Sequence, residues 1–130
     1  MKAEIARRLE AARGIAELAG ELLARHFRRL EAGQVAMKGR RDLVTAADLA
    51  SEELIGKRLA EAFPGDGLLA EEGVAAGNRA SPWLWVVDPL DGTTNFVHGF
   101  PHFSVSIGLW LEERPLLGVV RDPWRGGTYV

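Results

Sequence analysis

The sequence contains no cysteine, so neither a disulfide nor a thiolate metal site can form within it. It has no apolar run that approaches the roughly 20 residues needed to span a bilayer. Its first residues, Met1 to Glu4, begin a helical pattern and do not have the form of a signal peptide. These absences lead us to expect a cytoplasmic protein without a membrane partner.

The sequence also has no large excess of charge of one sign, because 16 basic and 18 acidic residues give a formal net charge of −2. The chain therefore has no overall basic field, and we expect no nucleic-acid partner. Basic residues do gather locally, at Arg25, Arg28, Arg29, Lys38, Arg40 and Arg41. We interpret this cationic segment as a solvated face in preference to a binding patch. With 130 residues, 47% of them hydrophobic, the chain is long enough for one folded core.

Apolar residues recur at spacings of three and four between residues 2 and 31, which predicts one long amphipathic helix. A polar loop is expected at 38–42, before a second helix at about 46–62. Thr45 and Asp48 match the T-x-x-D capping pattern. Thr45 is therefore predicted to cap the second helix, and Asp48 to be favoured in its first turn by the helix dipole.

Strand patterns fill the rest of the chain. The aromatic and β-branched run 83–87 predicts a buried strand that breaks into a turn at Asp88, and the apolar run 68–70 predicts a strand before it. The small and polar segment 73–81 predicts a mobile connection between these strands. Beyond residue 103, segments separated by turns predict an antiparallel meander.

These elements predict an α+β fold, in which two long amino-terminal helices pack on a largely antiparallel sheet. The sequence shows no internal repeat and no linker between domains. We therefore treat residues 1–130 as one folding unit.

Two carboxylates follow the central strand, Asp88 at its end and Asp91 directly before Gly92. Gly92 allows the backbone to approach a ligand closely, and residues 93–95 (Thr, Thr, Asn) have the chemistry of a helix or turn start, where N–H groups attract an anion. The same residues also suit an ordinary turn. Two further acids, at 71–72, end the preceding strand, and acids gathered at strand ends repel one another unless a cation lies between them. The pattern thus favours carboxylates for a hard cation beside amides for a phosphate.

The run from Asp88 to Pro101, DPLDGTTNFVHGFP, resembles the signature of the inositol monophosphatase family of magnesium-dependent, lithium-sensitive phosphomonoesterases. Lys38, residues 42–48 (DLVTAAD), 63–64 and 71–72 follow that family's order and approximate spacing. The resemblance implies the amino-terminal half of a layered α-β-α-β-α sugar-phosphatase fold, because relatives are about twice as long. The carboxy-terminal half would lie outside this chain.

The resemblance also implies ligands for two or three Mg²⁺ ions. Asp88 would bridge two ions, Glu71 and the main-chain carbonyl of Leu90 would complete the first site, and Asp91 would share the second with an aspartate beyond Val130. Oxygen ligands without cysteine favour magnesium over zinc. Glu72 would act behind these ligands or take part in a third, weaker ion site.

For catalysis, the resemblance implies hydrolysis of a small phosphorylated polyol or sugar, first of all inositol monophosphate, by metal-activated water without a covalent intermediate. The amides of Gly92 and Thr93 would hold the substrate phosphate, and Asp91 would belong to the same substrate site. The Thr93 hydroxyl and Glu71 would orient the water. Asp48 and Lys38 are implied as further catalytic residues, with Asp48 near the metal site and Lys38 within reach of a metal-bound water or the phosphate. A homodimer and lithium sensitivity are implied in the same way.

Alternatives remain at this point. A covalent D-x-D-x-T mechanism is disfavoured because Asp88 and Asp91 are three positions apart, and zinc at His98 and His102 is disfavoured because Gly99 and Pro101 interrupt any helix through them. Related sugar, fructose bisphosphate, histidinol or nucleotide phosphates are other possible substrates. A binding protein is a second hypothesis, because some bacterial relatives associate with the transcription machinery. A third is an inactive metal-binding remnant, if the 130 residues were the complete protein, since one metal would then lack a carboxylate.

Overall fold

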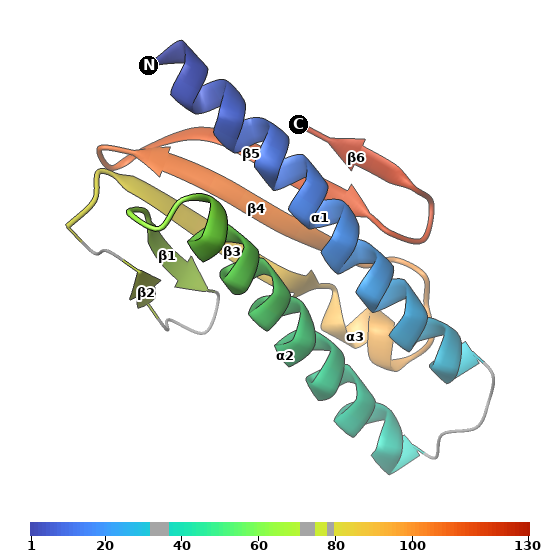
Figure 1. Ribbon diagram of the computed structural model, residues 1–130. Helices are drawn as coiled ribbons and strands as arrows, with labels where there is room; N and C mark the ends of the chain where they lie inside the picture. Colours follow the sequence, from blue (N-terminus) through green and yellow to red (C-terminus); the bar gives the residue numbers. More distant parts are fainter. Residues whose placement is uncertain (32–36, 71–74, 78–79) are drawn as a thin grey trace.

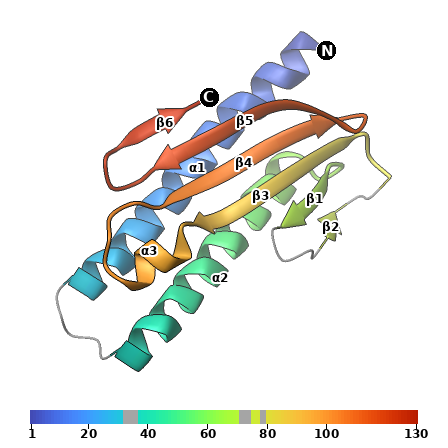
Figure 2. The ribbon, with the colours of Figure 1, turned by 180° about the vertical axis from the view of Figure 1, so that it is seen from behind.

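The computed structural model describes residues 1–31, 37–70, 75–77 and 80–130. Two long helices, α1 (Lys2–Glu31) and α2 (Met37–Ala62), lie side by side on one face of a six-stranded sheet, as Figure 1 shows. In the opposite view, Figure 2, no described helix covers the central strands. No described helix is both long and apolar enough to cross a membrane. The predicted fold class, α+β with two amino-terminal helices on the sheet, is confirmed.

The sheet has the order β2-β1-β3-β4-β5-β6. Its strands, with the short helix that follows β3, are β1 (Gly67–Ala70), β2 (Ala75–Gly77), β3 (Trp83–Asp91), α3 (Thr93–Val97), β4 (Ser104–Leu111), β5 (Arg114–Asp122) and β6 (Gly127–Tyr129). Strands β1 and β3 are parallel, and every other neighbouring pair is antiparallel. The predicted meander is therefore confirmed as β4, β5 and β6.

The apolar stripe of α1 packs against the sheet and against the segment that follows β3, which confirms the predicted first helix. Phe27 contacts the rings of Phe96 and Phe103 at centroid distances of 5.2 and 4.9 Å. Trp124, from the turn after β5, also contacts Phe27, with a distance of 4.9 Å between the ring centroids. Because Phe96 belongs to α3, this aromatic cluster fixes the short helix against the core.

Helix α2 begins earlier than the sequence predicted, and this corrects three expectations. Residues 38–42 are helical and not a polar loop, Thr45 does not cap the helix, and Asp48 lies in its interior. The Thr45 hydroxyl donates to the carbonyl of Arg41, 3.0 Å away and one turn earlier. The helix extends backward because Leu43 and Val44 are already buried on its core side.

The segment predicted as a mobile connection contains a strand. Residues 75–77 form β2, which pairs antiparallel with β1, with Gly67 opposite Gly77 and Leu69 opposite Ala75. The prediction of an irregular connection is therefore wrong for these residues. The physical reason is that β1 would otherwise be the edge of the sheet, with unpaired backbone groups available for a returning strand.

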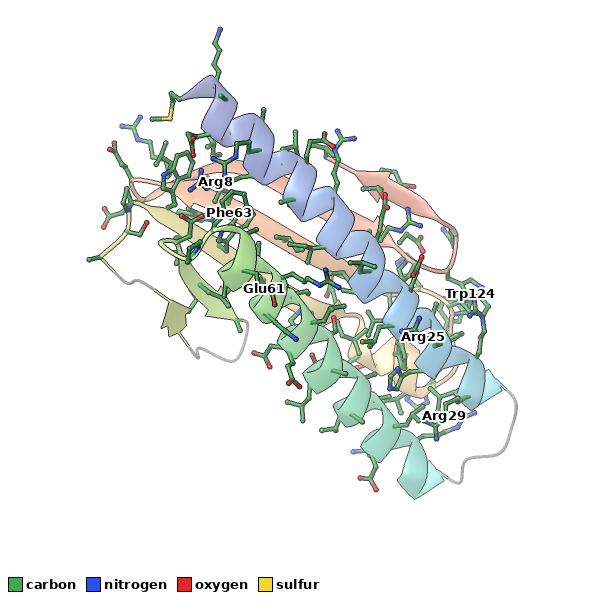
Figure 3. The ribbon with its side chains drawn as sticks, in the orientation of Figure 1. Arg8, Arg25, Arg29, Glu61, Phe63 and Trp124 are labelled. Atoms are coloured by element: carbon green, nitrogen blue, oxygen red, sulfur yellow. The ribbon has the colours of Figure 1, made fainter. Side chains whose placement is uncertain are left out.

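A buried ion pair joins the start of α1 to the turn before β1. The Arg8 guanidinium donates twice to Asp66, with both N–O distances 2.9 Å, and the indole of Trp85 donates to the same carboxylate at 2.9 Å. Arg8 also lies over the ring of Phe63, 4.6 Å from its centroid, and Figure 3 shows the two side chains together. Its hydrogen bonds to Asp66 raise the pKa of Arg8, although burial opposes them. The Arg8 guanidinium therefore stays charged at all pH values at which proteins are folded.

The hairpin between β4 and β5 has a conformation that its residues do not favour. Glu112 and Glu113 form its two-residue loop, with φ values of 50° and 68°. Positive φ at both positions is what a type I′ turn requires, and Asn-Gly is the preferred sequence there. Left-handed backbone costs an ordinary residue about 1–2 kcal/mol.

We therefore expect the double substitution Glu112→Asn with Glu113→Gly to raise the free energy of unfolding by about 1–2 kcal/mol. Urea titration followed by circular dichroism measures the change. The double variant Glu112→Gln with Glu113→Gln removes the same charges and keeps the backbone cost, so it should not raise stability. Equal stabilisation by both double variants would assign the effect to charge.

Candidate functional site

The two aspartates of the central motif lie at the end of β3, on either side of a β-bulge. The strand does not end at Asp88, as the sequence suggested, but continues to Asp91. Asp88 lies opposite Ser106 of β4 and Asp91 lies opposite Ser104, so that Pro89 and Leu90 together face one residue of the partner strand. Pro89 has no N–H to donate to the ladder, which explains why pairing is interrupted here.

This bulge decides which way the two carboxylates face. In a regular strand, residues three positions apart point to opposite faces of the sheet. The extra residue changes that relation, because Ser104 and Ser106 are two apart on β4 and therefore share a face. Asp88 and Asp91, as their cross-strand partners, lie on that same face. The bulge thus brings together two acids that a regular strand would separate.

The backbone around the bulge is held by side chains. The Asp88 carboxylate is half-buried and accepts a hydrogen bond from the Leu90 N–H at 3.3 Å, whereas Asp91 is exposed. Leu90 itself is 1% exposed and packs in the core. On the other side of the bulge, the Ser51 hydroxyl of α2 donates to the Pro89 carbonyl at 2.7 Å.

The end of β1 lies beside this region. Strands β1 and β3 run parallel, and Ala70 is the register partner of Val87. Both strands therefore end at the same edge of the sheet, as the sequence predicted. Glu71 and Glu72, the two predicted acids that follow Ala70, lie outside the described residues.

Within the part of the chain that the structure describes, no three Asp, Glu or His side chains come close enough to hold a metal ion. Asp88 and Asp91 are thus the described members of the predicted carboxylate set. Whether Glu71 joins them stays a prediction.

Gly92 turns the chain sharply after Asp91. Its φ is 88°, and a Cβ at this position would lie 2.8 Å from the carbonyl oxygen of His102. Only glycine fits such a turn without strain. Helix α3 begins at the next residue, Thr93, which confirms the predicted helix start. The segment that follows folds back, because the Asn95 side-chain amide donates to the same His102 carbonyl at 3.1 Å.

The histidines do not lie on one helix. Helix α3 ends at Val97, His98 follows it, and Gly99 has a φ of 73°. The predicted interruption between His98 and His102 is therefore confirmed, and both side chains are exposed.

A cleft of about 530 Å³ lies between α2 and α3. Its lining residues are Arg41, Val44, Thr45, Asp48, Leu49, Thr93, Thr94, Val97 and His98. Two residues that the resemblance had placed near one centre, Asp48 and Thr93, thus share one cleft. Lys38 belongs to α2, but its side chain lies outside the described part of the molecule.

Sequence reasoning missed two residues that fix this region. The guanidinium of Arg40 donates to the carbonyl of Val97 at 3.2 Å, which joins α2 to the end of α3. Ser51 is fully buried in the middle of an apolar stripe, with Ala47 and Ile55 one turn away on either side. A serine at a core position of an amphipathic helix is a sequence signal for a buried polar contact.

The described residues form an α+β fold in which Asp88 and Asp91 lie at the end of β3, beside the end of β1. The chain belongs to the inositol monophosphatase family, whose model matches residues 4–130. This confirms the family resemblance seen in the sequence.

Individual relatives agree with the family assignment. The chain is 46% identical over 118 residues to inositol monophosphatase 3 of Solanum lycopersicum, and this match covers 88% of this chain and 43% of the relative. It is 43% identical over 114 residues to the Nus factor SuhB of Pasteurella multocida, and this match covers 88% of this chain and 43% of the relative. The solved inositol monophosphatase of Anabaena superimposes with a TM-score of 0.79 at 36% identity, covering 96% of this chain and 43% of that one. The chain spans about two fifths of the length of the curated relatives it matches.

Proposed function

We propose that this chain provides the amino-terminal part of a metal-dependent phosphatase site that hydrolyses a small phosphorylated polyol or sugar, with inositol monophosphate as the first substrate to test. The observation that supports this most directly is the bulge that puts Asp88 and Asp91 on one face, directly before Gly92 and the start of α3. Family membership supports the same reaction class.

The donor set fits magnesium. Asp88, Asp91 and the Leu90 carbonyl offer only oxygen atoms, and the chain has no cysteine that would favour zinc. Two or three Mg²⁺ ions would be held by these groups, by Glu71 and by an aspartate outside this chain. When bound, the metal would neutralise the phosphoryl oxygens, activate the attacking water and support the leaving oxygen.

The remaining steps belong to the protein's own groups. We assign the amides of Gly92 and Thr93 to the phosphate, because Gly92 is the N-cap of α3 and Thr93 its first residue. The exposed Thr93 hydroxyl orients the water with Glu71, and Asp48 and Lys38 support it from α2. No covalent intermediate forms on Asp88, since the bulge spacing differs from the D-x-D pattern of the covalent enzymes. Homodimer formation, lithium sensitivity and a cytoplasmic location belong to the same proposal.

We expect Asp91→Asn to weaken Mn²⁺ binding to this 130-residue chain by at least about tenfold, because even partners behind a metal ligand contribute about 10–100-fold. Mn²⁺ electron paramagnetic resonance counts the free ion in a titration. Glu53→Gln, an exposed acid on α2, removes the same charge away from the site and should bind as the wild type does. The corresponding activity is magnesium-dependent release of phosphate from inositol monophosphate, lost in Asp91→Asn. Unchanged Mn²⁺ affinity in Asp91→Asn would contradict the proposal.

A second candidate function is contact with the transcription machinery, because several relatives are named Nus factor SuhB. The structure adds a pocket of about 300 Å³ that three arginines and one glutamate line, with Arg25, Arg28 and Glu21 from α1 and Arg121 from β5. Figure 3 shows Arg25 on the half of α1 that leads to Arg29. The Asp91→Asn variant separates the two functions, since an adaptor would keep its biological activity without the carboxylate.

A further inference from the structure

Ser51 links α2 to the bulge that carries the two aspartates. Its side chain is 0% exposed, and its hydroxyl donates to the Pro89 carbonyl at 2.7 Å. We infer that Ser51 is a positioning residue for the metal site, because it holds the bulge that turns Asp88 and Asp91 to one face. The inference rests on the proposed function for the identity of the ligand, and on geometry alone for the role of the serine.

The bulge gains from such a contact because Pro89 and Leu90 have no register partner on β4. Pro89 has no N–H, and the Leu90 N–H is directed to the carboxylate of Asp88. The hydrogen bond from Ser51 therefore fixes the peptide that lies between a candidate metal ligand, Asp88, and the candidate ligand carbonyl of Leu90. Any rotation of this peptide would change the direction of both groups.

The position of the hydroxyl is itself fixed. Ala47 and Ile55 are both 0% exposed, one turn before and one turn after Ser51, so the helix cannot shift locally without disturbing the core. Arg40 makes the second contact from α2, to the Val97 carbonyl at 3.2 Å. Helix α2 thus holds the site both before and after Gly92. Through Ser51, the bulge is therefore bonded to a part of α2 that is packed in the core.

A serine that only stabilised the fold would lower stability without a selective effect on the site. The test therefore compares Ser51→Ala with Ile55→Val, which loosens the same helix face and leaves the Pro89 contact in place. Both variants are 130-residue chains, studied at a temperature at which circular dichroism shows them folded. The Mn²⁺ affinity is measured by electron paramagnetic resonance.

We expect Ser51→Ala to weaken Mn²⁺ binding by about tenfold, and Ile55→Val to leave it within about twofold of the wild type. A second measurement needs no metal. The amide of Leu90, which donates to Asp88, should exchange its hydrogen at least about tenfold faster in Ser51→Ala and not selectively faster in Ile55→Val.

The outcomes separate the two hypotheses. A wild-type chain that binds no Mn²⁺ overturns the proposed function, and the exchange of the Leu90 amide then decides alone whether Ser51 holds the bulge. A wild-type chain that binds Mn²⁺ no better than Ser51→Ala overturns the positioning role, even if exchange is faster. Unchanged exchange at Leu90 in Ser51→Ala overturns it as well.

Discussion

Replacing Asp66 by asparagine should lower the free energy of unfolding by about 3 kcal/mol, near the lower end of the range for breaking a buried ion pair. The substitution keeps the shape of the side chain but leaves the buried Arg8 guanidinium without the carboxylate that accepts two of its hydrogen bonds. Glu4 remains, 2.9 Å from the same guanidinium, and limits the loss. Urea unfolding at pH 7 measures the difference.

Glu4→Gln is the matched control, since it removes the other carboxylate that contacts Arg8. Arg8 and then Arg7 lower the pKa of Glu4, but the Glu4 side chain is about half exposed, and solvent screening weakens such ion pairs. We therefore expect a much smaller change than for Asp66→Asn. If the two variants lost the same stability, burial would not be what makes the Arg8–Asp66 pair important.

The ion pair was not predictable from the sequence. Asp66 stands in a run of helix-breaking residues, where an acid normally marks a turn, and its partner is 58 positions away. The long helix α1 and the meander were predictable, because their apolar residues repeat with the period of the element itself. Contacts between distant segments carry no such local repeat.

The start of α2 shows how a local signal can mislead. Thr45 and Asp48 satisfy a capping pattern. Such a pattern caps a helix only where the residues before it are not helical. Here Leu43 and Val44, directly before Thr45, are already buried in the core, and Arg40 donates to the Val97 carbonyl from the same helix. The tertiary contacts of α2 thus decide where the helix begins, because a capping interaction contributes little free energy in comparison.

The candidate site divides in the same way. The sequence identified Asp88, Asp91 and Gly92, because their residue types carry the chemistry that a cation and a phosphate need. It placed the aspartates in one turn, whereas they flank a bulge whose existence depends on pairing with Ser104 and Ser106. Ser51 belongs to the same long-range geometry. The sequence therefore predicted which residue types the site contains, but not the bulge and the Ser51 contact that orient them.

Gly92→Ala should be among the most damaging single substitutions near the site. The residue has a φ of 88°, and a methyl group there would lie 2.8 Å from the His102 oxygen and 3.3 Å from the Cα of Phe103. Both neighbours are backbone atoms, which cannot rotate away. The left-handed conformation costs alanine about 1–2 kcal/mol, and forcing an extra carbon into a filled space typically costs about 1–3 kcal/mol more. We expect a total loss of about 3 kcal/mol in urea unfolding.

Gly126→Ala isolates the steric part of this loss. Gly126 has a similar φ of 83°, but a Cβ there would meet nothing within 4 Å. It should therefore lose only the conformational share, about 1–2 kcal/mol. Because Gly92 directly follows Asp91, the Gly92→Ala variant should also lose Mn²⁺ affinity, whereas Gly126→Ala should not. Equal losses of stability in the two variants would mean that the chain relieves the contact with His102 by moving the segment after α3, and the turn at Gly92 would then not fix the site.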